Sequence, residues 1–269
     1  MKLETYFNRI GYAGPVRPDL ETLAAVMRAH LFAIPFENLD VQLARPISLE
    51  PERIFDKLVE RRRGGWCYEQ NGLLGMALRE IGFDVTRLAG GVMRDQRGDV
   101  ALGNHLCLLV KLDRPYLVDV GFGGSLLAPI PFETADHDQA PFKLRLFEMD
   151  DGYWRFEEKA DGEPFSYDVA AAPADESLLA KTCVFLQTHP SSPFVQNLVA
   201  QKRDGARHLT LRGRVLKDLG ADGATKRLIE TPDELVSVLA GRFGIDLPEA
   251  ASLWPAIVER HEKLFGGDA

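Results

Sequence analysis

The sequence predicts an α+β fold in which a helical part comes first, an antiparallel sheet follows and a mixed α/β part ends the chain. Through about residue 84, apolar residues recur at helical spacing. From there to about residue 190 they lie in short runs, rich in β-branched and aromatic side chains, that turn-forming residues separate. Strand-like and helix-like stretches then alternate. We therefore predict three domains, at residues 1–84, 85–190 and 191–269.

Three helices are expected to pack together as a bundle in the first domain. Their expected positions are residues 18–35, 48–61 and 67–83. Ser48 is the expected N-terminal cap of the second helix, because a serine side chain can accept from a free backbone N–H. Gly82 is the expected end of the third helix, because glycine readily adopts the left-handed conformation of a helix C-terminus.

The second domain is expected to be a barrel of short strands. The five expected strands are residues 84–93, 104–112, 116–122, 142–150 and 152–159. Since the strands are short and follow one another closely, we expect an antiparallel sheet that is closed or strongly curled. The third domain is expected to combine strands in residues 207–219 with helices at residues 231–245 and 255–265.

Composition excludes several classes of function. The net charge of -8 argues against nucleic-acid binding, which needs a concentrated basic surface. No apolar run approaches the roughly 18–20 residues that span a bilayer, and the N-terminus lacks the apolar core of a signal peptide. We therefore expect a cytoplasmic protein without a membrane partner. The three cysteines have neither the number nor the spacing of a disulfide framework or a zinc site, so no metal is expected.

Cys67 is the candidate nucleophile. It follows Gly64, Gly65 and a tryptophan, and the glycines are expected to break the preceding helix so that the next begins at the cysteine. The free N–H groups and positive dipole end of a helix N-terminus stabilise a thiolate. Cys107 and Cys183 are interpreted as inert apolar residues. From this stretch alone, Cys67 is equally compatible with a buried small side chain.

His105 and Asp119 are the candidate partners of this thiol. His105 is the one histidine of six that lies inside a strongly apolar strand, where a hydrogen-bonded core histidine is the usual explanation. Asp119 interrupts another apolar strand, where an unpaired charge would be costly. An aspartate that orients an imidazole would explain both residues, as in a catalytic triad. A purely structural polar pair is the alternative.

Strand register tests this pairing. If residues 112–114 form a three-residue hairpin loop, Lys111 pairs with Pro115. Asp119 then lies opposite Cys107 and diagonal to His105, about 7–8 Å away between Cα atoms and on the same face. A two-residue loop would put the two side chains on opposite faces. The glycines at 121, 123 and 124 that follow could cradle a phosphate or simply turn the chain at the strand end.

Several stretches of the chain, in order, resemble those of the arylamine N-acetyltransferase family in its compact, bacterial form. "RGGWCYEQN" is similar to the signature around the nucleophile of that family, and "HLFAIPFENLD" to its upstream block. "NHLCLLV" and "YLVDVGFGG" resemble the segments that carry its histidine and aspartate. "HPSSPFVQNL" resembles the segment that opens its third domain. The resemblance is dense over the first half of the chain and thinner over the last third.

The resemblance implies a mechanism and an architecture. Cys67 would accept the acetyl group of acetyl-CoA, His105 would be its base partner and Asp119 would orient the imidazole. The reaction would be ping-pong: the acetyl-cysteine thioester forms, CoA leaves, and an arylamine or arylhydrazine takes the acetyl group. A cysteine-protease-like arrangement would present the cysteine of the bundle to the barrel, with the α/β domain as a lid. A role in xenobiotic metabolism would follow.

The resemblance also implies roles for other residues. Phe36 and Phe194 would border the acceptor pocket, although plain core packing is the alternative for Phe36. The predicted contacts of the CoA pyrophosphate are Gly123, Gly124 and Ser125. The predicted buried polar support beneath the site consists of Glu37, Asn38, Arg63, Glu69 and Asn71.

Other functions are compatible with the same three residues. A thiol hydrolase or a transglutaminase-like amidase uses a Cys–His–Asp triad but passes the acyl group to water or lysine. Some relatives form amide bonds from another acyl donor. A binding module that kept the fold is disfavoured because all three triad positions are intact. The physiological acceptor, and whether the chain is a monomer or a homodimer, stay open.

Overall fold

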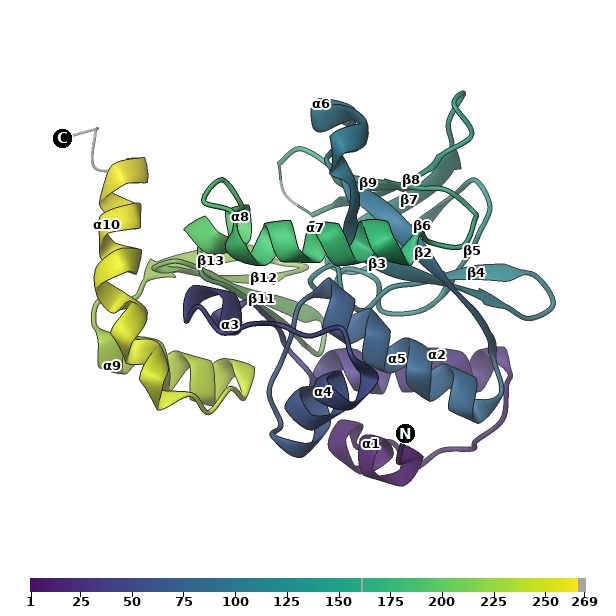
Figure 1. Cartoon of the computed structure of the whole chain (residues 1–269), viewed down its shortest axis with the longest axis horizontal. Coiled ribbons are helices and arrows are strands. Elements are labelled where there is room, and N and C mark those ends of the chain that lie inside the picture. Colours follow the sequence, from purple (N-terminus) through teal and green to yellow (C-terminus); the bar gives the residue numbers. More distant parts are fainter. Residues whose placement is uncertain (161, 266–269) are drawn as a thin grey trace.

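The computed structural model describes residues 1–160 and 162–265, so residues 266–269 of the predicted third domain lie outside the described part. A group of helices, an eight-stranded antiparallel sheet and a five-stranded sheet with the C-terminal helices follow one another along the chain (Figure 1). The sequence of helical, β and mixed parts agrees with the predicted α+β class. The exact domain boundaries stay a prediction.

The N-terminal helices lead up to α5, the helix that begins at Cys67, and three of them pack against it (Figure 1). The helices of this part are α1 (Leu3–Ile10), α2 (Leu20–Ala33), α3 (Leu39–Gln42), α4 (Pro51–Phe55) and α5 (Cys67–Ile81). A π-helical turn, Asp56–Glu60, continues α4. As predicted, α5 ends at Gly82, which has a φ of 107°. The sequence pattern missed α1, whose few apolar positions cover barely two turns.

The start of the second predicted helix was wrong. The helix begins at Pro51 after Glu50, and the Ser48 hydroxyl accepts from the backbone N–H of Glu50 at 3.1 Å instead of capping a helix. The proline explains the shift, because its missing N–H and fixed φ suit the first helical position. Asp19 caps α2 through the backbone N–H of Thr22 at 2.8 Å.

The eight-stranded antiparallel sheet curls into a nearly closed barrel in the order β5-β4-β3-β2-β9-β8-β7-β6. Its strands are β2 (Asp84–Val92), β3 (Leu102–Lys111), β4 (Pro115–Val118), β5 (Ile130–Pro131), β6 (Ala135–Gln139), β7 (Phe142–Glu148), β8 (Trp154–Lys159) and β9 (Phe165–Val169). The side-chain amide of Gln139, on the edge strand β6, bonds the backbone N–H and carbonyl of Ala128 near the other edge. The two free edges are therefore joined by a side chain.

The predicted hairpin register is confirmed. Lys111 pairs with Pro115 and Leu108 with Val118, so the loop has three residues. Asp119 follows directly after β4 and continues the same alternation. This register puts Asp119 on the side of the hairpin where His105 lies.

The long helix of the central region was not predicted. Helix α7 (Glu176–Thr188) lies across β3, with Asp175 as its cap (Figure 1). The side chains of Leu179, Cys183 and Leu186 form its buried face. The short α6 (Arg94–Arg97) and a 3₁₀ turn, Gly98–Ala101, separate β2 from β3.

The five-stranded sheet connects the N-terminal part of the chain to its last third. Its order is β1-β10-β11-β12-β13, and β1 (Phe36–Glu37) comes from the N-terminal helical part. The other strands are β10 (Val199–Asp204), β11 (Arg207–Arg212), β12 (Val215–Gly220) and β13 (Gly223–Leu228). Its helices are α8 (Pro193–Gln196), α9 (Pro232–Val238) with a π-helical turn Leu239–Phe243, and α10 (Trp254–Phe265) after a 3₁₀ turn Pro248–Leu253. Because β1 pairs with β10, residues next to the N-terminal helices are tied directly to the last third of the chain.

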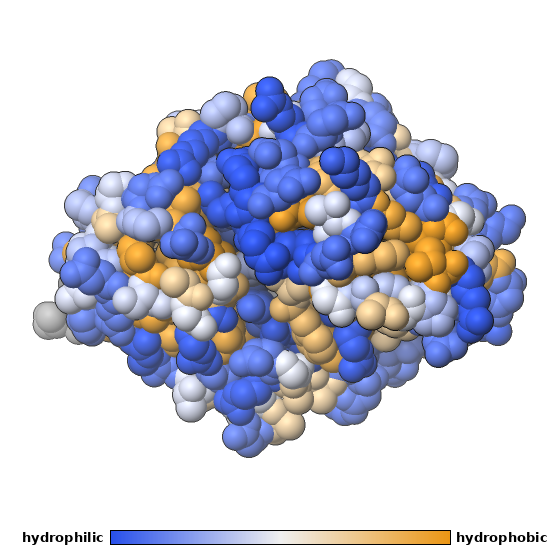
Figure 2. All heavy atoms as spheres, turned by 90° about the horizontal axis from the view of Figure 1, so that it is seen from below, coloured by the Kyte–Doolittle hydropathy of each residue, from blue (hydrophilic) through white to orange (hydrophobic). Residues whose placement is uncertain are grey.

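Three apolar clusters stabilise these parts. One joins the N-terminal helices to the barrel, a second lies between the second sheet and the C-terminal helices, and the third surrounds Cys67. On the face shown in Figure 2, hydrophobic residues occur in patches between hydrophilic ones. Within residues 1–160 and 162–265, no helix is long and apolar enough to cross a bilayer.

Candidate active site

Cys67 is the first residue of α5, and its side chain is almost fully buried at 3% exposure. A carboxylate oxygen of Glu69 accepts from the backbone N–H of Trp66 at 3.3 Å, which occupies one free donor of the helix N-terminus. The Cys67 sulfur lies 4.0 Å from the carbonyl oxygen of Asn104 on β3. The first turn of α5 therefore presents the sulfur to the barrel.

Two glycines let the backbone pack closely around this turn. A Cβ atom on Gly64 would lie 2.3 Å from the Pro35 carbonyl oxygen, and one on Gly121 would lie 2.6 Å from the Cα atom of Cys67. The preceding helical segment ends at Glu60, so Gly64 does not terminate it as the sequence analysis predicted. The glycines are required by close approach of neighbouring segments, which sequence alone does not distinguish from helix breaking.

His105 and Asp119 form a buried hydrogen-bonded pair. The His105 Nε2 atom lies 2.7 Å from Oδ2 of Asp119, and both side chains are about 2% exposed. The rings of Tyr167 and Phe122 pack on the imidazole with centroids 4.7 and 5.3 Å away. Gly90 lies opposite His105 on β2, where an added Cβ would come within 3.3 Å of the histidine side chain.

The pKa of His105 is raised to about 10. Burial by itself lowers the pKa, but the charge of Asp119 and its hydrogen bond outweigh that effect. Interaction with the Cys67 side chain raises the pKa further, so the sulfur is close to the imidazole. An imidazolium and a helix N-terminus are two kinds of neighbour that stabilise thiolates in proteins.

Asn71, one turn after Cys67, connects α5 to the strand that carries Asp119. Its amide donates to Oδ1 of Asp119 at 2.8 Å and to the Leu106 carbonyl at 2.6 Å, and it accepts from the N–H of Val120 at 3.0 Å. The backbone N–H of Gly121 also donates to Oδ1 of Asp119 at 2.8 Å. Both carboxylate oxygens of Asp119 thus have partners, so its orientation toward His105 is well defined.

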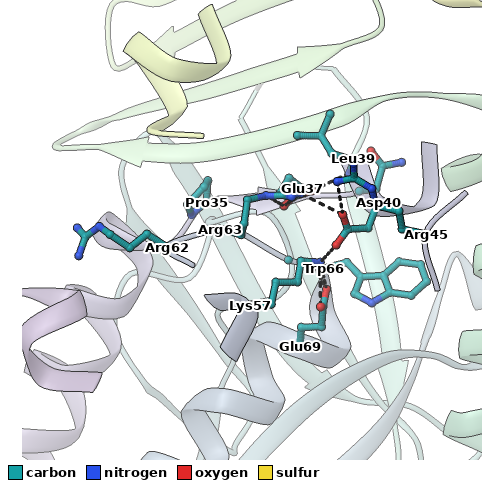
Figure 3. Close-up of polar contacts among 12 residues, drawn as sticks. Pro35, Glu37, Leu39, Asp40, Arg45, Lys57, Arg62, Arg63, Trp66 and Glu69 are labelled. Atoms are coloured by element: carbon teal, nitrogen blue, oxygen red, sulfur yellow. Dashed lines mark hydrogen bonds and ion pairs between the residues drawn. The ribbon is translucent and has the colours of Figure 1, made fainter. Parts of the chain in front are cut away.

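A buried ionic cluster lies beneath the first turn of α5 (Figure 3). The Lys57 ammonium is 2.8 Å from Asp40 and 2.9 Å from Glu69, and the Arg63 guanidinium is 2.7 Å from Glu37. Burial lowers the pKa of Lys57, but the charge of Glu69 and the other carboxylates more than compensates. Every charge in this cluster has an oppositely charged partner.

The structure separates residues that the sequence analysis grouped as support. Glu37, Arg63 and Glu69 belong to the ionic cluster, and Asn71 contacts Asp119. Asn38 contributes elsewhere, because its amide donates to the carbonyls of Phe194 and Asn197 at 2.8 Å and accepts from the N–H of Val199.

Lys57, buried beside Leu58 in the apolar stripe of its helix, was missed. A charged residue inside an apolar stripe was the available signal.

Cys67 and His105 line a cleft of about 520 Å³. This volume suits a small organic ligand. Of the predicted pocket residues, Phe36 and Phe194 both line the cleft, with ring centroids 6.2 Å apart. Lining residues that the sequence analysis did not propose include Val92, Arg97, Phe122, Glu158, Phe165 and Arg212. Most come from strands whose distance from Cys67 along the chain concealed their proximity.

The predicted CoA contacts, Gly123, Gly124 and Ser125, are buried and are not among the residues that line this cleft. A Cβ on Gly123 would overlap the Gln201 side chain at 2.0 Å, and His208 Nε2 contacts the Gly123 carbonyl at 2.5 Å. Both glycines have positive φ, 85° and 105°, so this segment is a tight turn. The turn packs on the second sheet.

The remaining cysteines lie in apolar surroundings. Burial raises the pKa of Cys107 well above its usual value and that of Cys183 to about 12. In the described residues, no group of three or more histidine, cysteine, aspartate or glutamate side chains is arranged to hold a metal ion.

Comparison with known proteins identifies the family to which this fold and site belong. The family model described as N-acetyltransferase matches residues 19–252. The arylamine N-acetyltransferase of Mycolicibacterium smegmatis is 41% identical over 263 residues, which are 93% of this chain and 94% of that protein. The arylamine N-acetyltransferase of Mycobacterium tuberculosis is 34% identical over 280 residues, with 100% and 99% covered.

Solved structures agree with these matches. The structure of Mycobacterium marinum arylamine N-acetyltransferase has a TM-score of 0.88 at 35% identity, covering 96% of this chain and 99% of that chain. A structure of the same enzyme in complex with CoA has a TM-score of 0.87. The class of protein is therefore an acyltransferase enzyme. More particularly, the chain belongs to the arylamine N-acetyltransferase family.

Proposed function

We propose that this protein transfers the acetyl group of acetyl-CoA to the nitrogen of an arylamine or arylhydrazine through an acetyl thioester on Cys67. The observation that carries the proposal is the arrangement in one cleft of Cys67 at a helix N-terminus, His105 beside it and Asp119 hydrogen-bonded to His105. The names of the relatives, and the relative solved with CoA, support the donor and the acceptor.

In the first half-reaction, the Cys67 sulfur attacks the thioester carbonyl carbon of acetyl-CoA. The tetrahedral intermediate collapses by breaking the bond to the CoA sulfur, which leaves as a thiolate and takes a proton from the His105 imidazolium. The oxyanion needs donors that are already in place. The N–H of Cys67 is the nearest candidate, because the first N–H of a helix has no carbonyl partner one turn earlier.

In the second half-reaction, the amine nitrogen attacks the acetyl-cysteine carbonyl, and His105 removes the proton that the nitrogen loses. The Cys67 thiolate is then released as the amide forms. A weakly basic aromatic amine requires an activated carbonyl such as a thioester, and thioester exchange with CoA supplies one at little cost in free energy. Asp119 holds the imidazole in one orientation and stabilises its protonated form.

The same proposal includes the predicted cysteine-protease-like arrangement, in which the helical bundle presents Cys67 to a barrel that carries His105 and Asp119, with the last domain as a lid. It is supported by the direct packing of α5 against β3, which both contribute residues to the cleft lining. The bonds of Asn38 to residues 194–199 support a fixed contact between the proposed lid and the bundle. Glu37, Arg63, Glu69 and Asn71 are proposed as positioning residues.

The contacts of each substrate follow from the cleft lining. Phe36 and Phe194 are proposed to border the acceptor. The proposed contact of the CoA pyrophosphate with Gly123, Gly124 and Ser125 has less support, because these residues are buried. Arg97 and Arg212 instead place two guanidinium groups on the cleft lining, where they can attract the CoA phosphates.

A thiol hydrolase or an amidase would use the same triad, and another acyl donor would use the same thioester chemistry. The hydrolase and the amidase differ from the proposed transferase in a measurable way. A hydrolase would release free acetate or cleave amides without CoA, whereas the transferase requires an amine to discharge the acetyl-enzyme. The cytoplasmic location and the role in xenobiotic metabolism remain predictions.

The test is to incubate the protein with acetyl-CoA and no acceptor, and to map any acetyl adduct by mass spectrometry. We expect one adduct on Cys67, its absence in Cys67→Ala, and its persistence in the matched control Cys183→Ala. Addition of an aniline should then remove the adduct and release the acetanilide. An adduct at another residue, or none, would contradict the proposed function.

A further inference from the structure

Glu158 is a cleft residue that the proposed mechanism does not use. It lies on β8 between Leu144 of β7 and Phe165 of β9, and it lines the same cleft as Cys67 and His105. Its Oε2 atom is buried and has no hydrogen-bond partner among the described residues. The Ser125 hydroxyl is close enough to interact with this carboxyl group and lower its pKa, but it too is buried without a hydrogen bond of normal geometry among the described residues. Buried polar groups in native proteins normally have partners, so this carboxyl group points to a ligand.

Aromatic rings connect Glu158 to the reacting groups. Phe165, its neighbour on β9, stacks on Phe122 with centroids 5.1 Å apart and an interplanar angle of 7°. Phe122 in turn contacts the His105 imidazole at 5.3 Å. The Phe165 side chain is 42% exposed although it is large and apolar. A flat aromatic ligand bound near His105 can therefore contact Phe122 and extend toward Glu158.

The carboxyl group is neutral near pH 7, so it is a hydrogen-bond donor. Burial raises the pKa of Glu158 to about 8; contact with Ser125 opposes this and the charge of Asp119 adds to it. The other charged or titratable groups that line the cleft with Glu158 are Cys67, Arg97, His105 and Arg212, and Asp119, Tyr167 and His137 lie on neighbouring segments. Among these, Asp119 is the charge that shifts the pKa of Glu158.

We propose that Glu158 determines acceptor specificity by donating a hydrogen bond to a carboxylate or carbonyl oxygen on the ring of the acceptor amine. This inference rests on the proposed function, since it concerns the second substrate of that reaction. A donor in a partly buried site favours an acceptor that satisfies it over one that leaves it unpaired. Acetylation of Cys67, which precedes acceptor binding, does not involve this hydrogen bond.

The experiment compares kcat/KM for 4-aminobenzoate, which carries a carboxylate, with that for 4-methylaniline, which is similar in shape and carries none. Glu158→Leu should lower kcat/KM for 4-aminobenzoate by about tenfold or more, with 4-methylaniline nearly unchanged. Glu158→Gln keeps an N–H donor and should retain most of the preference. The matched control is Glu157→Leu, the adjacent carboxylate on the opposite face of the strand.

A second measurement uses the wild-type protein and so does not depend on how the Leu variant folds. The ratio of kcat/KM for 4-aminobenzoate to that for 4-methylaniline should fall as the pH rises from 7 to 9, because ionised Glu158 repels the carboxylate. The ratio cancels any titration of His105 that affects both acceptors, and in Glu158→Gln it should stay flat. Equal losses with both acceptors in Glu158→Leu, or a flat wild-type ratio, would overturn the inference. Failure of wild-type protein to acetylate Cys67 would instead overturn the proposed function.

Discussion

His30 and His105 are both fully buried histidines that contact α5, yet their surroundings differ in one decisive respect. His30, on α2, has a tyrosine hydroxyl on one ring nitrogen, Tyr6 at 2.9 Å, and an amide oxygen on the other, Gln70 at 2.7 Å. His105 has a carboxylate, Asp119, on Nε2, and its ring also interacts with the Cys67 side chain. The first histidine faces the helical core, whereas the second lines a cleft.

The partners produce opposite pKa shifts. Burial lowers the pKa of His30 to about 4, because the hydrogen bond to Gln70 recovers only part of the lost solvation and Arg9 opposes a second positive charge. The pKa of His105 is raised to about 10 in spite of equal burial, because Asp119 supplies a full negative charge. The comparison teaches that a buried histidine becomes a candidate proton carrier through a carboxylate partner and access to a cleft.

The largest expected effect comes from removing the charge of that partner. Asp119→Asn should lower kcat/KM by about 10³- to 10⁴-fold, because the new amide donates toward His105 Nε2 and forces the wrong tautomer. Steady-state kinetics with circular dichroism would measure the loss and the integrity of the fold. The matched control is Asp168→Asn, a barrel carboxylate that is 1% exposed and pairs with Arg155. Similar losses of activity in both variants would remove the distinction between the cleft pair and other buried pairs.

A smaller effect, on stability, is expected from the ionic cluster, which is charged but does not line the cleft. Lys57→Met should lower the free energy of unfolding by about 3–5 kcal/mol, because Asp40 and Glu69 lose a buried partner. Lys143→Met, which removes an exposed ion pair with Asp138, should cost less than about 1 kcal/mol. Chemical denaturation measures both. Equal costs would mean that burial of the cluster does not matter.

The smallest effect is expected at the neutral histidine. His30→Gln should lower the free energy of unfolding by about 1–3 kcal/mol at pH 7 and change kcat/KM by less than about tenfold. A folded-state pKa lowered from 6.5 to about 4 stabilises the protein fully above pH 6.5, and that stability is lost as the pH falls toward 4. The difference between wild type and His30→Gln should therefore shrink on acidification over that range. A constant difference would show that His30 keeps its ordinary pKa in the folded protein.

Local sequence predicted the elements that local physics controls. Helix α5 ends at Gly82 as expected, and the loop of residues 112–114 has the length that places Asp119 on the His105 side. The predictions failed where a distant segment made the decision. Gly121 is required because α5 packs against it, and α7 was missed because its apolar face becomes evident only against β3.

The candidate site divides in the same way. Residue types and spacing pointed to Cys67, His105 and Asp119. A charged residue in an apolar strand needs a partner, and a cysteine at a helix start is a candidate nucleophile. The same information did not distinguish which polar residues face the cleft. Asn38 and Asn71 were assigned to one support network, but they bind different segments of the chain.

The sequence by itself determined the family, the candidate nucleophile and its partners, and the register of the hairpin that aligns them, since these depend on residue identity and short-range spacing. Only the tertiary structure decided that Lys57 lies under Cys67 as part of an ionic cluster and that Glu158 lines the cleft without a hydrogen-bond partner for Oε2. The reason is physical: burial, charge pairing and access to a cleft depend on contacts between segments that are far apart in the chain, and no local pattern encodes them.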